Sequence, residues 1–195
     1  VVLHGDNYDE ASKYAKTLCE AQGLVYIPPY DDVDVIAGQG TIGMEIVNQH
    51  REPLDAIFVP VGGGGLVAGV AAYVKYLHPQ IKIIGVEAQG SNCLDAAIRA
   101  GRRVRLPIDQ LDLFADGVSV TQIGKETFKV AKKYVDDVVV VNVDEICAAI
   151  KDVFEDTRCV AEPAGALAIA GMKRYVDAHP GMSHVVSIVS GANVN

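Results

Sequence analysis

Four consecutive glycines, Gly62, Gly63, Gly64 and Gly65, stand between a β-branched apolar run and an amphipathic segment that begins at Leu66. Because glycine has no Cβ, this stretch of backbone, the glycine loop, can bend sharply and approach a ligand closely. The free N–H groups of the helical turn that follows would point at that ligand, and the helix dipole adds about half a positive charge. The pattern predicts a phosphate site, and the alternative is a tight turn without a ligand.

Two further segments carry polar side chains that can reach such a ligand. Ser190 follows the last apolar run and precedes a glycine, so its hydroxyl would lie at the carboxyl end of a predicted strand. Ligands of open α/β sheets bind beyond these strand ends, although Ser-Gly also occurs in ordinary turns. Glu162 precedes Pro163 at the start of a predicted helix, and its simplest role is to stabilise that helix N-terminus.

The type of phosphate ligand stays open when only the spacing is considered. Gly63-x-Gly65-x-x-Ala68 fits the pattern of dinucleotide-binding loops, and Glu87 ends the next predicted strand, where a ribose-binding acid belongs. A dinucleotide-binding dehydrogenase domain is therefore an alternative prediction. A P-loop is excluded, because neither Lys-Ser nor Lys-Thr follows the glycines.

Five motifs follow one another along the chain: Val35-Ile36-Ala37-Gly38-Gln39-Gly40-Thr41, the glycine loop with Leu66, Phe114-Ala115-Asp116-Gly117-Val118, Glu162-Pro163-Ala164-Gly165-Ala166 and Ser190-Gly191-Ala192-Asn193. In this order they resemble the threonine ammonia-lyase (threonine dehydratase) family of fold-type-II pyridoxal-phosphate enzymes. The resemblance covers essentially all 195 residues. The stretches 3–7 and 150–156 favour the biosynthetic type, which serves isoleucine synthesis, over the catabolic type.

The resemblance implies a cofactor, a reaction and residue roles. The glycine loop and the N–H of Leu66 would hold the phosphate of pyridoxal 5'-phosphate. Ser190 would hydrogen-bond the pyridine nitrogen, and Glu162 would support the same side of the ring. A neutral hydroxyl at that place leaves the nitrogen largely unprotonated, which fits an elimination. The substrate would be L-threonine, or less effectively L-serine, and threonine would give 2-oxobutanoate and ammonia.

Two family motifs are absent, a Gly-Asn-His type loop whose Asn contacts the ring hydroxyl and the motif that carries the catalytic lysine. Members carry Ser-x-Lys-x-Arg, whose lysine forms the Schiff base with the cofactor, and none of the ten lysines here follows Ser-x. In the family this motif lies upstream of the segment that corresponds to Val1. We therefore expect this chain to be a central piece of a larger enzyme. The piece by itself would contain no catalytic residue and would be inactive. Residues 1–30 would be a remnant of the smaller domain, and residues 31–195 part of the large cofactor-binding domain.

The elements that must position these residues alternate along the chain. Short β-branched runs predict strands at 1–4, 24–27, 56–61, 82–87, 137–141 and 184–189. Amphipathic segments predict helices at 36–47, 66–77, 92–100, 125–134, 144–154 and 164–179, besides one that Asp6 or Asn7 caps and Gly23 ends. Strands that are apolar on both faces indicate a parallel sheet. The expected fold class is α/β, an open, mostly parallel sheet with helices on both faces, tryptophan synthase β-like by the resemblance and incomplete.

Composition narrows the class of protein further. With 50% hydrophobic and 22% charged residues the chain is not intrinsically disordered. A net charge of −8 argues against nucleic acid and anionic membranes as partners. No apolar run reaches the roughly 18 residues of a membrane span, and no Cys or His spacing predicts a metal site. We expect a cytoplasmic enzyme acting on a small amino acid, and by the resemblance a homo-oligomer, a tetramer.

Overall fold

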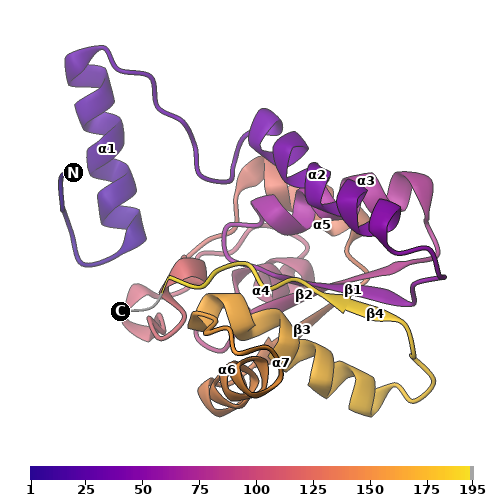
Figure 1. Ribbon diagram of the computed structural model, residues 1–195. Helices are drawn as coiled ribbons and strands as arrows, with labels where there is room; N and C mark the ends of the chain where they lie inside the picture. Colours follow the sequence, from indigo (N-terminus) through magenta and orange to yellow (C-terminus); the bar gives the residue numbers. More distant parts are fainter. Residues whose placement is uncertain (194–195) are drawn as a thin grey trace.

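The computed structural model describes residues 1–193, and a parallel sheet forms the centre of this part of the chain (Figure 1). The strands are β1 (Ala56–Pro60), β2 (Lys82–Ala88), β3 (Asp137–Val141) and β4 (Val185–Ser187). They pair in the order β3-β2-β1-β4, and every pairing is parallel. The carboxyl ends of all four strands therefore meet at one edge of the sheet, where α/β proteins bind their ligands.

Helices cover both faces of the sheet (Figure 1). One face carries α6 (Val143–Thr157) and α7 (Pro163–Ala178), and the other carries α3 (Gly65–Leu77), α4 (Cys93–Ala100) and α5 (Lys125–Tyr134). Helix α2 (Val33–Gln49) packs against α3. Successive side chains of β1 alternate between the two cores, with Phe58 in the core under α7 and its neighbours Ile57 and Val59 in the core under α3. The predicted α/β class with a parallel sheet is confirmed.

Helix α1 (Tyr8–Gln22) stands apart from the sheet (Figure 1). The Asn7 side chain caps it by accepting the N–H of Glu10, and Gly23 ends it in the left-handed conformation at a φ of 65°, as the sequence predicted. None of its residues is buried. Asp9 connects it to the rest of the molecule, because its carboxylate accepts the Thr121 hydroxyl and pairs with Arg105.

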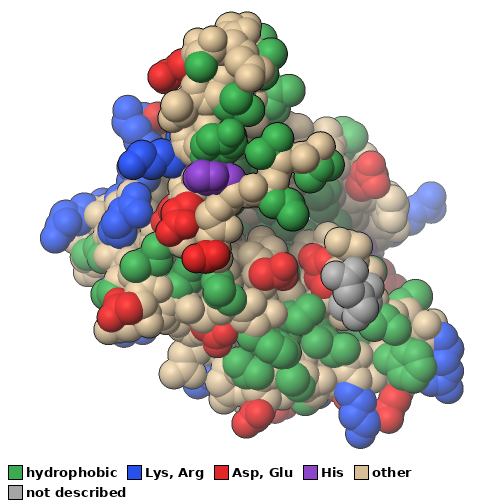
Figure 2. All heavy atoms as spheres, turned by 90° about the vertical axis from the view of Figure 1, so that its left-hand side faces the viewer, with side chains coloured by type: hydrophobic (Ala, Val, Ile, Leu, Met, Phe, Trp, Pro, Cys, Tyr) green, Lys and Arg blue, Asp and Glu red, His purple; other side chains and the backbone are tan. Residues whose placement is uncertain are grey.

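The prediction of strands at residues 1–4 and 24–27 is wrong. Both segments lack regular structure, although their residues are β-branched and apolar. A strand needs a second strand to satisfy its backbone hydrogen bonds, and nothing among residues 1–193 pairs with either segment. Their large side chains are consequently exposed, with Leu3 at 92% and Val25 at 87%. Figure 2, which faces the side of α1, shows apolar side chains on this surface.

Candidate functional site

The residues predicted to bind a ligand line one cavity at the carboxyl edge of the sheet. Its volume is about 490 Å³. Its wall includes all seven of them, Gly62, Gly63, Gly64, Gly65, Leu66, Glu162 and Ser190. They come from the β1–α3 connection, the start of α7 and the segment after β4. Parallel strands bring these three places together, because each place adjoins the same edge of the sheet.

The backbone N–H groups of the glycine loop have no hydrogen-bond partner within residues 1–193. Gly64 precedes α3 with a φ of 93°, and the first turn of α3 has no side-chain cap. Among residues 1–193 the N–H groups of the loop and of Leu66 find no acceptor. Backbone N–H groups in such half-buried places are nearly always paired. Together with the positive end of the α3 dipole, these groups make a site suited to a phosphate or a similar anion.

The protein's own packing also requires the glycines. A Cβ at Gly63 would enter the ring of Tyr30, and one at Gly62 would lie 2.9 Å from the Cα of Val118. Four glycines in a row therefore do not by themselves separate a ligand site from a tightly packed turn. The unpaired N–H groups are the feature that favours a ligand site.

Ser190 lies on the cavity wall at the place expected for it, on the segment after β4. Its hydroxyl donates to the carbonyl of Ala164 at 3.4 Å. This distance is long for an O–H···O hydrogen bond, so the bond is weak. The hydroxyl can therefore turn toward an acceptor on a ligand at small cost.

Glu162 differs from the simplest expectation. It is the N-cap residue of α7, but its side chain makes no cap hydrogen bond. Its carboxylate instead accepts the backbone N–H of Asn193 at 2.9 Å, and its own N–H donates to the carbonyl of Gly191 at 3.1 Å. Glu162 therefore fixes the segment that carries Ser190, rather than stabilising the start of α7.

Glu87 does not occupy a ribose site. It is fully buried, and its two oxygens accept the N–H groups of Leu94 at 2.7 Å and Asp95 at 2.8 Å, which caps α4. Burial raises the pKa of this carboxyl to about 8, and the two N–H donors limit the rise. Because neither oxygen faces the cavity, the dinucleotide-binding alternative built on Glu87 is wrong.

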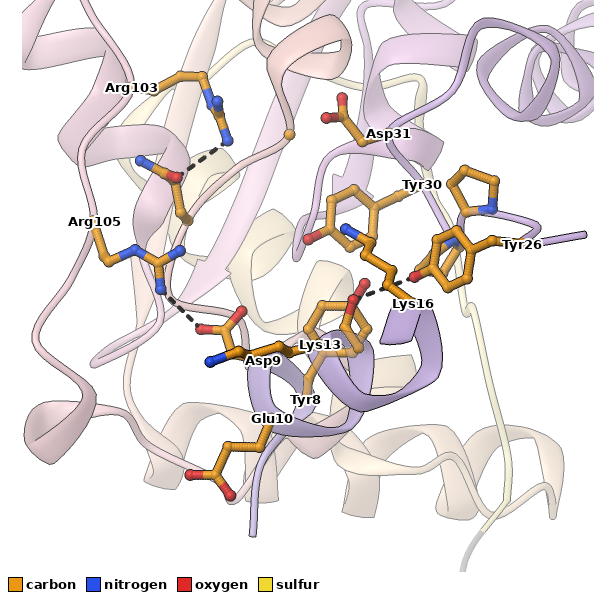
Figure 3. A pocket seen from close by; sticks show the side chains of 15 residues that line it. Tyr8, Asp9, Glu10, Lys13, Lys16, Tyr26, Tyr30, Asp31, Arg103 and Arg105 are labelled. Carbon is orange, nitrogen blue, oxygen red and sulfur yellow. Dashed lines mark hydrogen bonds and ion pairs between the residues drawn. The ribbon is translucent and has the colours of Figure 1, made fainter. Parts of the chain in front are cut away.

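Tyr30 is a cavity residue that the sequence did not single out. Its ring packs on Gly63, and burial raises the pKa of its hydroxyl, which therefore stays neutral. Tyr8, Pro29 and Tyr30 also border a second cavity of about 630 Å³ beside α1 (Figure 3). In the sequence, only the position of this aromatic residue after Pro28 and Pro29 drew attention to it, and that position does not predict a contact with Gly63. Gln39 and residues 116–120 line the first cavity as well.

Residues 1–193 contain neither a metal-binding cluster nor a membrane-spanning helix. No group of three His, Cys, Asp or Glu side chains in this range is arranged to hold a metal ion. No helix in the same range is long and apolar enough to cross a bilayer.

Comparisons with known proteins converge on one family. Residues 1–191 match the family described as "Pyridoxal-phosphate dependent enzyme". The whole chain is 53% identical to "L-threonine dehydratase biosynthetic IlvA" of Pasteurella multocida, of which it covers 38%. It is 54% identical to "Threonine dehydratase biosynthetic, chloroplastic" of Arabidopsis thaliana, of which it covers 33%. Most of each relative therefore has no counterpart in this chain.

A solved structure gives the same result. The processed form of threonine deaminase isoform 2 from Solanum lycopersicum superposes with a TM-score of 0.94 at 46% identity, over 100% of this chain and 56% of that one. The family match extends through the glycine loop and Ser190 to residue 191. The chain therefore belongs to the family of pyridoxal-phosphate dependent enzymes.

Proposed function

We propose that this chain supplies the phosphate and ring-nitrogen contacts of a biosynthetic threonine dehydratase. The observation that carries the proposal is that the glycine loop, Ser190 and Glu162 share one cavity. The relatives described above are named threonine dehydratases or threonine deaminase. The reaction converts L-threonine, and less effectively L-serine, to a 2-oxo acid and ammonia. With threonine it yields 2-oxobutanoate, as the first step of isoleucine biosynthesis.

The residues that line the cavity fit pyridoxal 5'-phosphate. Its phosphate needs several hydrogen-bond donors, and the glycine loop with the first turn of α3 offers backbone N–H groups for this purpose. Among residues 1–193, no Lys or Arg lies on the wall of this cavity. Recognition of the phosphate therefore depends on backbone N–H groups and the helix dipole rather than on a charged side chain.

When bound, pyridoxal phosphate supplies a conjugated ring that draws electrons from the α-carbon of the substrate. The role of this chain is to hold the ring in a fixed place. The Ser190 hydroxyl can donate to the ring nitrogen, while Glu162 fixes the segment on which Ser190 lies. A hydroxyl does not keep a proton on that nitrogen, so electron withdrawal stays moderate, which suits loss of the β-hydroxyl as water. Water is taken up again when the nitrogen leaves as ammonia.

The remaining parts of the proposal concern the whole enzyme. We assign residues 1–30 to the smaller domain and residues 31–195 to the large domain. The catalytic lysine would come from outside this stretch, which agrees with a cavity wall that contains no lysine. We also propose a cytoplasmic homo-oligomer, a tetramer, although the name of the A. thaliana relative places that protein in the chloroplast.

The test is an assay of the full-length protein that carries this sequence. It should contain pyridoxal phosphate by absorbance and should form 2-oxobutanoate from L-threonine faster than it consumes L-serine. Ser190→Ala should lower kcat about tenfold, because about 1.4 kcal/mol of stabilisation at the ring nitrogen is lost. Ser183→Ala, at the amino end of β4, is the matched control and should leave kcat unchanged. Lack of both bound cofactor and 2-oxobutanoate would contradict the proposal.

A further inference from the structure

We propose that Asp31 is a positioning residue: it sets the orientation of the glycine loop through helix α5, and so the affinity for a phosphate-bearing cofactor. The inference rests on the proposed function, because it concerns the same phosphate site. Asp31 does not line the 490 Å³ cavity. Asp31 instead contacts the start of α5, which lies against the side of the glycine loop that faces away from the cavity.

Asp31 caps α5 from a distant part of the chain. Its carboxylate accepts the first three N–H groups of the helix, at 2.8, 2.7 and 3.3 Å from Lys125, Glu126 and Thr127. The N-cap residue of α5 is Gly124, which has no side chain to cap the helix. A Cβ at Gly124 would collide with the Asp31 carboxylate. The carboxylate therefore takes the place of the missing local cap and determines where α5 begins.

Helix α5 in turn holds the glycine loop. The Thr127 hydroxyl donates to the carbonyl of Gly63 at 2.8 Å, and the Gly124 N–H donates to the same carbonyl at 3.1 Å. In a trans peptide the C=O and the next N–H point in opposite directions. Because α5 binds the Gly63 carbonyl on the outer side, the N–H of Gly64 points the opposite way, toward the cavity. Asp31 thus influences the direction of the Gly64 N–H through two contacts. The first joins Asp31 to α5, and the second joins α5 to the Gly63 carbonyl.

The neighbouring residue reinforces this arrangement. Tyr30 packs its ring on Gly63, so adjacent residues of one segment fix the loop, one by direct packing and one through α5. Figure 3 shows both side chains projecting from this segment at the edge of the second cavity. Pro28 and Pro29 precede them, and proline restricts the backbone, which makes the segment stiff.

A purely structural cap and a positioning residue make different predictions. Loss of a structural cap lowers the stability of the protein and affects every ligand of the site equally. Loss of a positioning residue selectively weakens ligands that carry the phosphate. Pyridoxal 5'-phosphate and pyridoxal differ only in that group, so the pair separates the two roles.

The experiment measures the Kd of both compounds by spectroscopic titration of the full-length protein. Asp31→Ala should raise the Kd of pyridoxal 5'-phosphate about tenfold and change that of pyridoxal less than about twofold. Asp31→Asn keeps an oxygen acceptor and should recover most of the affinity. Asp32→Ala is the matched control, because Asp32 caps α2 through the N–H of Asp34 at 2.8 Å and makes no bond to α5. It should leave both Kd values unchanged.

Thr127→Val provides an independent test if Asp31→Ala does not fold. It removes the hydroxyl that binds the Gly63 carbonyl and should raise the Kd of pyridoxal 5'-phosphate about fivefold. Where both variants fold, the double variant should raise this Kd by less than the product of the two single fold-changes, because both substitutions weaken the same contact between α5 and Gly63. Equal weakening of both compounds, or unchanged Kd values in a protein of lower Tm, would overturn the inference. A wild-type protein that binds no pyridoxal 5'-phosphate would overturn the proposed function itself.

Discussion

Glu87 is a fully buried carboxyl that caps a second helix beside the glycine loop, much as Asp31 caps α5. It caps α4 from the end of β2, and α4 begins with Cys93. The Cys93 thiol lies 3.5 Å from the carbonyl of Gly62, and burial raises the pKa of this thiol, which therefore stays protonated and can donate. Two acidic side chains thus hold the N-terminal ends of two helices that bind successive loop carbonyls, α4 that of Gly62 and α5 that of Gly63.

We predict that Glu87 makes the stability of the protein depend on pH. Its folded-state pKa of about 8 lies above the ordinary 4.5, so between these values the folded protein binds a proton that the unfolded chain has released. Proton binding by Glu87 therefore stabilises the folded protein. This contribution to the free energy of unfolding is fully present below pH 4.5 and is lost as the pH rises through about 8. The slope from this group is at most about 1.4 kcal/mol per pH unit. Glu87→Gln should remove it.

The measurement is the Tm of the full-length protein and of Glu87→Gln across this pH range. The wild-type Tm should fall more steeply toward high pH than that of the variant. Glu145→Gln, which alters a partly exposed carboxyl in the capping box of α6, is the control and should retain the wild-type slope. Parallel Tm profiles for wild type and Glu87→Gln would refute this role.

Residue roles could be predicted from the sequence where a local pattern carries them. The glycine loop and Ser190 each adjoin a strand end, so their placement in one cavity follows from the α/β order. Asp31 and Thr127 could not be found in this way, because the contact between them spans 96 positions in the sequence. The contact between Glu162 and Asn193 could not be predicted for the same reason, since the two residues are 31 positions apart.

At the scale of elements, the close crossing of α2 and α3 sets the direction in which α3 leaves the glycine loop. A Cβ at Gly69 of α3 would lie 2.6 Å from the backbone N of Gly40 in α2. The backbones can approach this closely only because both positions lack a side chain. Gly38, two residues before Gly40 and therefore on the other side of α2, faces open space.

These two glycines of neighbouring helices therefore predict opposite effects. Gly69→Ala should destabilise the protein by about 1–3 kcal/mol, because overpacking forces the helices apart. Gly38→Ala should stabilise it by about 0.5–1 kcal/mol, because alanine loses less backbone entropy in a helix. Denaturant unfolding of the two variants checks both signs. Changes of the same sign would contradict this explanation of the crossing.

The central strands were predictable because their pattern and their pairing agree. Residues 56–61, 82–87 and 137–141 are apolar on both faces, and each finds a neighbour in the sheet. The segments 1–4 and 24–27 have the same composition, but a strand forms only where another strand satisfies its hydrogen bonds. Hydrophobic pattern reports which residues prefer to be buried, and it does not report whether a partner is present.

At the scale of the whole molecule, net charge is a poor guide to the ligand. The chain carries −8, yet the cavity is suited to an anion. Exposed charges are screened over about 8–10 Å, whereas the N–H groups of the glycine loop would act at hydrogen-bond distance. The charge balance argues against polyanionic partners and leaves a single small phosphate permitted.

The 195-residue chain by itself combines two features that bear on activity. Large apolar side chains of residues 1–30 are exposed, among them Leu3, Val25 and Ile27, and β3 and β4 are the edges of the sheet. Exposed apolar surface and unpaired edges favour self-association. Independently, the part of the cavity wall formed by the described residues contains no lysine that could react with the cofactor.

We predict that the isolated chain self-associates, binds a hydrophobic dye such as ANS, and forms no 2-oxobutanoate from L-threonine and pyridoxal phosphate. Sedimentation, dye fluorescence and a product assay check these three outcomes. A dilute monomer that melts cooperatively, or one that forms product, would contradict them.

The two predicted causes of inactivity separate in the double variant Val25→Glu/Ile27→Glu, which places charges on exposed apolar positions without adding an amine. It should reduce dye binding and association while the chain stays inactive, because the reacting amine is still missing. If the double variant became active, association alone would explain the inactivity, and one of the lysines in this chain would have to serve the cofactor. Continued inactivity of a dispersed, folded variant would instead agree with a missing lysine and exclude self-association as the cause.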